Sequence, residues 1–151
     1  MIFHLSIEAD DPRHVAGIIA ELWNGRAAPF PPVAEGSWMA IAGDERNTTV
    51  EVYPRGTELR LAEGDADSYG APGSPKPFTA THMAIATPHD RETVFAIAAR
   101  EGWPAKYRKR GGIFGVIEFW VEGSQLIEVL TPEMQREYLA MNMGFPPAAT
   151  A

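Results

Sequence analysis

Two histidines and two glutamates recur at matched positions in the two halves of the chain. His4 precedes Glu51 by 47 positions, and His82 precedes Glu128 by 46. Imidazole nitrogens and carboxylate oxygens are common ligands of divalent transition metals. Together they leave room for one or two water or substrate oxygens around the ion, which is typical of a reactive site. The four residues therefore predict one divalent metal site, and Glu51 and Glu128 are also candidates for moving a proton beside it.

Each of these four residues lies in a short stretch that reads as a strand. In Ile2–Glu8, the apolar Phe3, Leu5 and Ile7 alternate with polar residues that include His4. Side chains alternate across a strand, so the histidine leaves the apolar face. The apolar neighbours of the other three ligands are Val50 and Val52, Met83 and Ile85, and Ile127 and Val129. If each half curls, all four ligands line its hollow, where a dication would offset the repulsion between two carboxylates.

The first half of the chain predicts a strand, a helix and two or three further strands. Asp11 and Pro12 begin the helix, and Asn24 with Gly25 ends it. Pro29, Pro31 and Pro32 restrict any strand around them to a short or edge position. Further strands are expected at Trp38–Ala42, at Thr48–Tyr53 and, more weakly, at Glu58–Leu61.

The second half repeats this order after a segment rich in Gly, Pro, Asp and Ser at Glu63–Pro77, which predicts a linker. A strand at Thr79–Ala86 precedes a helix that Thr87 caps, with Pro88 in its first turn, and that ends at Gly102. Strands follow at Ala105–Lys109, Val116–Val121 and Gln125–Leu130, and a last helix runs from Pro132 to about Met143.

The repeated order predicts an α+β fold in which two βαβββ modules form curled mixed β-sheets with helices on the outside. The predicted boundaries are 1–62 for the first module, 63–78 for the linker, 79–131 for the second module and 132–151 for the C-terminal helix and tail. The last helix either covers a groove or a dimer seam, or packs into the core.

Composition restricts the class of function. The absence of cysteine excludes thiolate metal sites and a cysteine nucleophile. A formal net charge of −7 argues against nucleic acid as the partner. The one basic run, Lys106–Arg110, either holds an anionic substrate group or is a solvated edge strand. With neither a signal peptide pattern nor an apolar run of about 20 residues, no membrane partner and a cytoplasmic location are expected.

The paired βαβββ modules and their four ligands resemble the vicinal oxygen chelate superfamily. That superfamily includes glyoxalase I, methylmalonyl-CoA epimerase, extradiol dioxygenases and proteins of fosfomycin or bleomycin resistance. The resemblance covers nearly the whole chain, and the ligand set His4, Glu51, His82 and Glu128 is similar to that of glyoxalase I. It implies a metal-dependent lyase or isomerase that acts on a small substrate with vicinal oxygens by proton transfer. Glu128 would be the base, and Glu51 a ligand or a second base.

Two positions depart from the glyoxalase I pattern. Glu8 stands where bacterial members commonly have an arginine for the carboxylate of glutathione, and Arg55 stands where they often have asparagine. Both departures argue against glutathione as the co-substrate. Arg55 is predicted to contact substrate, and Glu8 either contacts substrate or a metal-bound water or is a strand-end carboxylate in solvent. Trp38 and Trp120, on hairpin strands, either line the substrate pocket or pack in the core.

Several alternatives stay open at this level. The same fold could sequester a small molecule without turnover, as in resistance proteins, or act as an Fe(II) dioxygenase. The ligands are compatible with Ni, Zn, Co, Mn or Fe. The resemblance implies a homodimer, in which one chain or two chains supply the four ligands.

Overall fold

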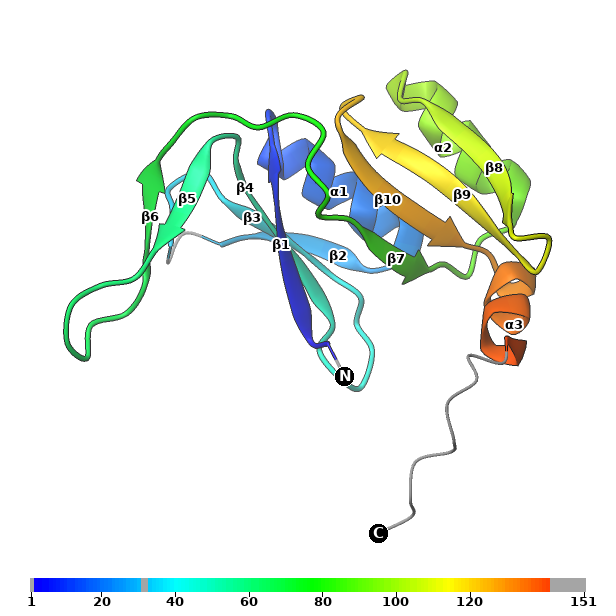
Figure 1. Cartoon of the computed structure of the whole chain (residues 1–151), viewed down its shortest axis with the longest axis horizontal. Coiled ribbons are helices and arrows are strands. Elements are labelled where there is room, and N and C mark those ends of the chain that lie inside the picture. Colours follow the sequence, from blue (N-terminus) through cyan, green and yellow to red (C-terminus); the bar gives the residue numbers. More distant parts are fainter. Residues whose placement is uncertain (1, 31–32, 142–151) are drawn as a thin grey trace, which may run out of the picture.

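Two four-stranded sheets and a two-stranded ribbon form the framework of the chain (Figure 1). The computed structural model describes residues 2–30 and 33–141. In the first sheet the strand order is β1 (His4–Ala9), β4 (Thr49–Pro54), β3 (Trp38–Ile41) and β2 (Arg26–Pro29). In the second it is β7 (Met83–Ala86), β10 (Gln125–Leu130), β9 (Phe114–Val121) and β8 (Ala105–Arg110). In both sheets the first pair is parallel and the other pairs are antiparallel.

The predicted α+β fold with two βαβββ modules is confirmed. Helix α1 (Pro12–Trp23) follows β1, and helix α2 (Arg91–Glu101) follows β7, so the two modules share one order of elements. Helix α3 (Pro132–Ala140) comes last and contacts β9 and β10. Within the described ranges, none of these helices is long and apolar enough to span a membrane. The domain boundaries given above stay a prediction.

Helix α1 begins and ends where the sequence predicts. The Asp11 side chain accepts a hydrogen bond from the backbone N–H of His14, and Pro12 occupies the first turn. Asn24 ends the helix in the left-handed region, at φ 54°. The next residue is glycine for a steric reason, because a Cβ on Gly25 would lie 2.1 Å from the carbonyl oxygen of Ile41. This close approach fixes the helix against the first sheet.

Four expectations about local structure were wrong. Phe3 does not join the apolar face of β1 but lies before it, 55% exposed. Helix α2 begins at Arg91 with Asp90 as its cap, whose side chain accepts the backbone N–H of Thr93. The Thr87 hydroxyl donates to the carbonyl oxygen of Leu22. The segment expected to be a linker contains strand β6 (Tyr69–Pro72), which pairs with β5 (Thr57–Arg60). Helix α3 ends at Ala140, and Met143 lies outside the described residues.

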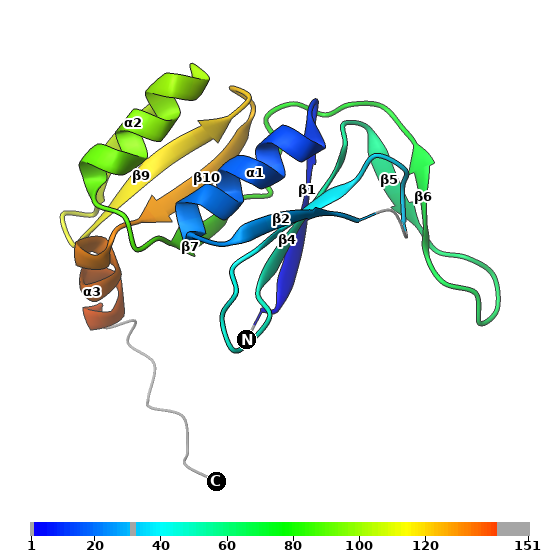
Figure 2. The same cartoon turned by 180° about the vertical axis from the view of Figure 1, so that it is seen from behind.

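The two modules pack through α1, and one hydrophobic core draws residues from both. Leu22 and Phe119, one from each module, are fully buried in it. Polar contacts also join α1 to the second module. His14 Nε2 lies 2.6 Å from Glu101 Oε2, and Arg100 Nη2 donates to Glu21 Oε2 at 2.6 Å. Figure 2 shows α1 between the first sheet and the strands of the second.

A second set of polar contacts joins the modules beside the start of α1, and we call Arg55, Asp10 and Glu122 the clasp. Arg55 donates to Asp10 Oδ1 at 2.5 Å and to Glu122 Oε2 at 2.6 Å. The Glu122 carboxylate also accepts the backbone N–H groups of Asp10 and Asp11, at 2.7 and 2.9 Å. The clasp therefore ties the β9–β10 turn to the start of α1 and helps fix the angle between the modules.

Candidate metal and substrate site

Glu51 stands in the middle of the first sheet, on the face that α1 does not cover. Its Oε2 atom accepts two hydrogen bonds of 2.8 Å, from the hydroxyls of Ser6 and Tyr53. Its Oε1 atom faces His4, with 4.0 Å to Nε2. His4 and Glu51 are thus neighbours across β1 and β4, and their role as metal ligands stays a prediction.

The Tyr53 hydroxyl stays protonated across the ordinary pH range. Burial, followed by the hydrogen bond to Glu51, raises the pKa of Tyr53 to about 12. A tyrosinate next to the Glu51 carboxylate would be both desolvated and repelled. Tyr53 therefore acts as a permanent donor toward this carboxylate.

Glu128 occupies the equivalent position of the second sheet. It lies opposite Ala84 on β7, as Glu51 lies opposite Ser6 on β1, and each histidine stands two residues before that partner. The register of the two sheets thus confirms that the two halves are structurally equivalent. His82 lies just before β7, is exposed, and has Nδ1 3.1 Å from the carbonyl oxygen of Ala80.

The partners of Glu128 are charged, unlike those of Glu51. Arg110 Nη2 donates to Glu128 Oε1 at 2.5 Å and to Glu118 Oε1 at 2.9 Å. Glu118 stands directly across from Glu128 in the sheet, and Arg108 Nε lies 3.5 Å from its other oxygen. The hydrogen bond to Glu128 raises the pKa of Arg110, so its guanidinium stays charged. The basic strand β8 is an edge strand, as one of the two interpretations predicted.

Glu51 and Glu128 share one further feature. Each glutamate uses one oxygen for its hydrogen bonds, Oε2 in Glu51 and Oε1 in Glu128. Within residues 2–30 and 33–141, the other oxygen of each accepts no hydrogen bond. Ligating carboxylates are usually oriented by such hydrogen bonds from neighbouring groups. Glu51 and Glu128 therefore each keep one oxygen that could bind an ion, and the ligand set of His4, Glu51, His82 and Glu128 stays a prediction.

A single chain does not bring the four residues together. The described part of the chain contains no group of three or more His, Asp or Glu that could hold a metal ion. His4 and His82 do line a common groove between β1 and β7, together with Phe3, Trp23 and Met83. Glu51 and Glu128 stand on separate sheets. The contacts of α1 and the clasp hold these two sheets in a fixed relative orientation.

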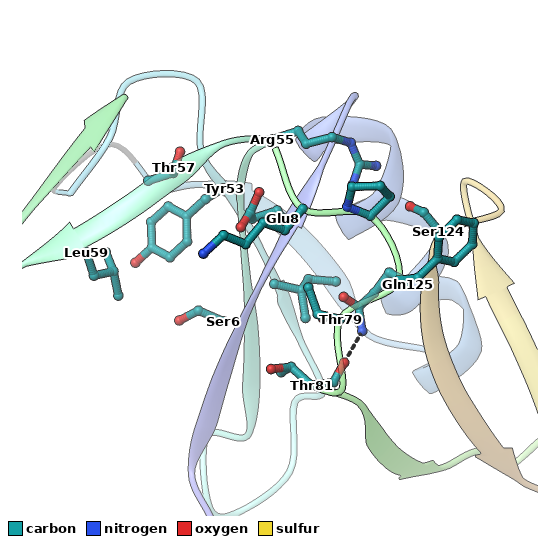
Figure 3. A pocket seen from close by; sticks show the side chains of 14 residues that line it. Ser6, Glu8, Tyr53, Arg55, Thr57, Leu59, Thr79, Thr81, Ser124 and Gln125 are labelled. Atoms are coloured by element: carbon teal, nitrogen blue, oxygen red, sulfur yellow. Dashed lines mark hydrogen bonds between the residues drawn. The ribbon is translucent and has the colours of Figure 1, made fainter. Parts of the chain in front are cut away.

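A cavity of about 180 Å³ lies beside Glu51. Ser6, Glu8 and Tyr53 form one wall, and Figure 3 shows Thr79 and Thr81 facing them from the segment before β7. Gln125 of β10 closes that side, where its Nε2 donates to the carbonyl oxygen of Thr81 at 2.7 Å. The full lining is Ser6, Ile7, Glu8, Tyr53, Arg55, Thr57, Leu59, Lys76, Pro77, Phe78, Thr79, Thr81, Ser124 and Gln125.

Sequence reasoning missed most of this cavity. Its wall between Lys76 and Thr81 spans the end of the predicted linker, 63–78, and the start of the strand expected at Thr79–Ala86, whereas β7 begins only at Met83. One residue in that polar segment could have indicated a binding site, the aromatic Phe78. Phe78 is 72% exposed, adopts φ 59°, and makes an edge contact with Trp120 at 6.4 Å. Non-glycine residues held at positive φ are uncommon and are found more often at binding sites than elsewhere.

The four residues predicted to contact substrate have different surroundings. Glu8 lines the cavity, and its Oε2 accepts the backbone N–H of Gly56 at 2.6 Å. Arg55 also lines it, but the clasp occupies its guanidinium. Trp38 packs on the core, with the Arg13 guanidinium 5.3 Å from the centre of its ring. Trp120 is not among the described residues that line the cavity, but its ring contacts that of Phe78, which does line it.

Comparison with known proteins gives structural matches without sequence matches. No family model and no curated protein matches the sequence. The fosfomycin resistance protein FosX from Listeria monocytogenes superposes with a TM-score of 0.57 at 13% identity, covering 91% of this chain and 97% of the other. FosX from Mesorhizobium loti gives 0.55 at 14% identity, with the same coverage. The trypanothione-dependent glyoxalase I of Leishmania major gives 0.51 at 18% identity, covering 92% and 91%.

These identities are low, so the matches establish architecture and not activity. Nearly the full length of each protein is matched, and both βαβββ modules are present here in the same chain. The chain has the vicinal oxygen chelate fold.

Proposed function

We propose that the protein is a metal-dependent lyase or isomerase of the glyoxalase type, which moves a proton on a small substrate with vicinal oxygens. One observation carries this proposal. At equivalent positions of two sheets, a glutamate has one oxygen fixed by hydrogen bonds and the other oxygen available, and a histidine accompanies it.

The chemistry assigned to each group follows from its position. A divalent ion held by His4, Glu51, His82 and Glu128 would stabilise negative charge on two adjacent substrate oxygens. Glu51 and Glu128 are the groups that can take a proton from a carbon next to a carbonyl. The cavity beside Glu51 suits a small polar substrate, with Glu8 in position to accept hydrogen bonds from its hydroxyls. A substrate contact by Arg55, Trp38 or Trp120 stays a prediction.

Two chains are proposed to complete the site as a homodimer. The open face of each sheet carries half of the ligands, and the contacts of α1 with the second module keep these faces from closing on each other within one chain. Phe3 beside His4, and Leu139 on α3, are large apolar side chains that are 55% and 82% exposed. A second copy that brings its second sheet onto the first sheet would cover apolar surface and join the half-sites.

Metal analysis and an activity panel test the proposal together. Protein treated with chelator is reconstituted separately with Ni, Zn, Co, Mn and Fe(II), and bound metal is counted per chain. Each form is then assayed with methylglyoxal hemithioacetals and with acyl-CoA epimers. We expect one ion per complete site, and turnover that chelation abolishes. Protein that binds none of the five metals would contradict the proposal.

Two other activities on this fold need separate measurements. The structure of the oxidase ChaP-H2 also matches, covering 87% of this chain at a TM-score of 0.53 and 14% identity. Oxygen consumption by the Fe(II) form would favour the dioxygenase alternative. The two FosX structures that match are fosfomycin resistance proteins. Tight binding of a small molecule that persists in Glu128→Gln, with no turnover by the wild type, would favour sequestration.

A further inference from the structure

We propose that the cavity binds a small zwitterion, an amino-hydroxy carboxylate whose ammonium group is held by Glu8 and whose carboxylate is held by Lys76. The inference rests on the proposed function, which places the substrate in this cavity, and it names the class of that substrate. A hydroxyl and a carboxylate on adjacent carbons supply the vicinal oxygens of such a molecule. The ammonium group is the feature that the cavity adds.

Two of the three charged residues that line the cavity are unpaired within the described chain. The Arg55 guanidinium is bound by the other members of the clasp. Lys76 forms no ion pair, and neither does Glu8, whose Oε2 accepts the backbone N–H of Gly56. A ligand that carries both charges pairs with both residues, whereas a singly charged ligand is attracted by one of them and repelled by the other.

The wall formed by Ser6, Glu8 and Tyr53 offers a ligand only acceptors. The hydroxyls of Ser6 and Tyr53 each donate their one proton to Glu51 Oε2, so only lone pairs remain for a ligand. Glu8 is half-buried, and its Oε1 accepts no hydrogen bond from the described residues. An ammonium group has three donors and no acceptor, which matches this wall, and a carboxylate does not.

The facing wall carries the donors. Figure 3 shows Thr79 and Thr81 opposite Ser6 and Glu8, on the segment that also supplies Lys76. The Lys76 ammonium and a threonine hydroxyl can both donate to a carboxylate, and the bond from the ammonium is charge-assisted. Lys76 is exposed, so the carboxylate end of the ligand lies nearer to solvent and the ammonium end lies deeper, at Glu8.

Ser124 gives an independent indication of a ligand. It lines the cavity, and its Oγ atom is buried without a hydrogen-bond partner among the described residues. Buried polar groups are nearly always paired, so an unpaired one on a cavity wall indicates a polar group of a ligand. The clasp fixes the turn that carries Ser124 through Glu122, two residues earlier. The uncharged hydroxyl of the ligand is the group assigned to Ser124.

The volume of the cavity restricts the ligand to a short chain. About 180 Å³ corresponds to roughly six water molecules. Isoserine is of this size and carries an ammonium, a hydroxyl and a carboxylate on successive carbons, so it serves as the probe. Each of two analogues lacks one charge: glycerate has a hydroxyl in place of the ammonium, and aminopropanediol has a hydroxymethyl group in place of the carboxylate.

Isothermal titration calorimetry of the full chain, as purified and after chelation, compares the three probes. Hydrogen bonds to charged groups change affinity roughly 10- to 100-fold, so we expect isoserine to bind at least about 10-fold more tightly than either analogue. Glu8→Gln should remove the preference over glycerate, and Lys76→Met the preference over aminopropanediol. Glu58→Gln is the matched control, because Glu58 is an exposed glutamate of β5 outside the cavity, and it should leave all three affinities unchanged.

A fourth probe tests the role of Ser124. β-Alanine differs from isoserine only by lacking the hydroxyl, and a neutral hydrogen bond changes affinity by roughly 2- to 10-fold. We therefore expect the wild type to prefer isoserine by about this factor and Ser124→Ala to show no preference. A preference that persists in Ser124→Ala would refute the assignment of the hydroxyl to Ser124.

The outcomes separate this inference from the proposed function. Equal affinity for isoserine, glycerate and aminopropanediol, or tighter binding of either analogue, would overturn the inference, and this comparison needs only the wild type. Protein that binds metal and turns over a methylglyoxal hemithioacetal but does not bind isoserine would overturn the inference and leave the function standing. Protein that binds isoserine with the expected preferences but binds none of the five metals would instead overturn the proposed function and leave the zwitterion site.

Discussion

Replacement of Arg55 by methionine tests whether this residue holds the two modules together or binds substrate. Its side chain is only 17% exposed and contacts Asp10 and Glu122, whose side chains are 68% and 14% exposed. The bond to Asp10 is close to solvent and contributes little. The bond to Glu122 is better shielded, and hydrogen bonds to charged groups contribute about 1.5–3 kcal/mol.

The expected loss follows from what remains after the substitution. Glu122 keeps two backbone donors, the N–H groups of Asp10 and Asp11, so its carboxylate is not left unpaired. This places the cost near the middle of the range, at about 2 kcal/mol in the free energy of unfolding. For a chain of this length, each kcal/mol lowers Tm by about 2–4 °C, so we expect a decrease of about 4–8 °C.

Thermal and urea unfolding measure this change, with Arg60→Met as the matched control. Arg60 is 52% exposed and pairs with Glu58 on the same strand, so its removal should change Tm by about 1 °C or less. Equal Tm values for wild type and Arg55→Met would refute the structural role. If Arg55→Met instead left stability unchanged and weakened substrate binding, Arg55 would belong to the binding residues predicted from the sequence.

Three further predictions concern the core, the module junction and the metal site. Leu22→Ala removes a fully buried side chain of α1 and should lower the free energy of unfolding by about 2–5 kcal/mol, measured by urea denaturation; a loss below about 1 kcal/mol would contradict its central place in the core. The hydrogen bond from Arg100 lowers the pKa of Glu21 below its usual 4.5, so this pair contributes stability above pH 4.5 that is lost as the pH falls through the lowered value. Stability followed from pH 6 to 3 should therefore fall less steeply in Glu21→Gln, and identical slopes would refute the contribution. His4→Ala should lower Co(II) affinity at least about 10-fold by equilibrium dialysis, whereas His14→Ala, which removes the partner of Glu101, should not change it.

Some of the residues around Glu51 and Glu128 could have been predicted from the sequence, and others could not. Glu51 and Glu128 occupy equivalent positions in the pairing of their strands, opposite Ser6 and Ala84. The repeated strand pattern predicts this, because strands with the same alternation pair in the same register. Tyr53 and Ser6 were within reach of this reasoning, as they stand two residues after Glu51 and after His4 on the same face. Arg110 was not, because its contact with Glu128 depends on how β8, β9 and β10 twist against one another.

The alternating residues along the strands, and the capped helices between them, determined the two βαβββ modules and the faces on which His4, Glu51 and Glu128 stand, whereas His82 lies just before β7. Those are local properties, fixed by the period of side chains along a strand and by the chemistry of helix ends. Only the tertiary structure decided that α1 joins the modules, that Arg55 fastens them, and that the segment before β7 closes a cavity over Ser6 and Tyr53. These features depend on contacts between residues far apart in the chain, where side-chain shape and charge select one packing among several that the same periodic pattern allows.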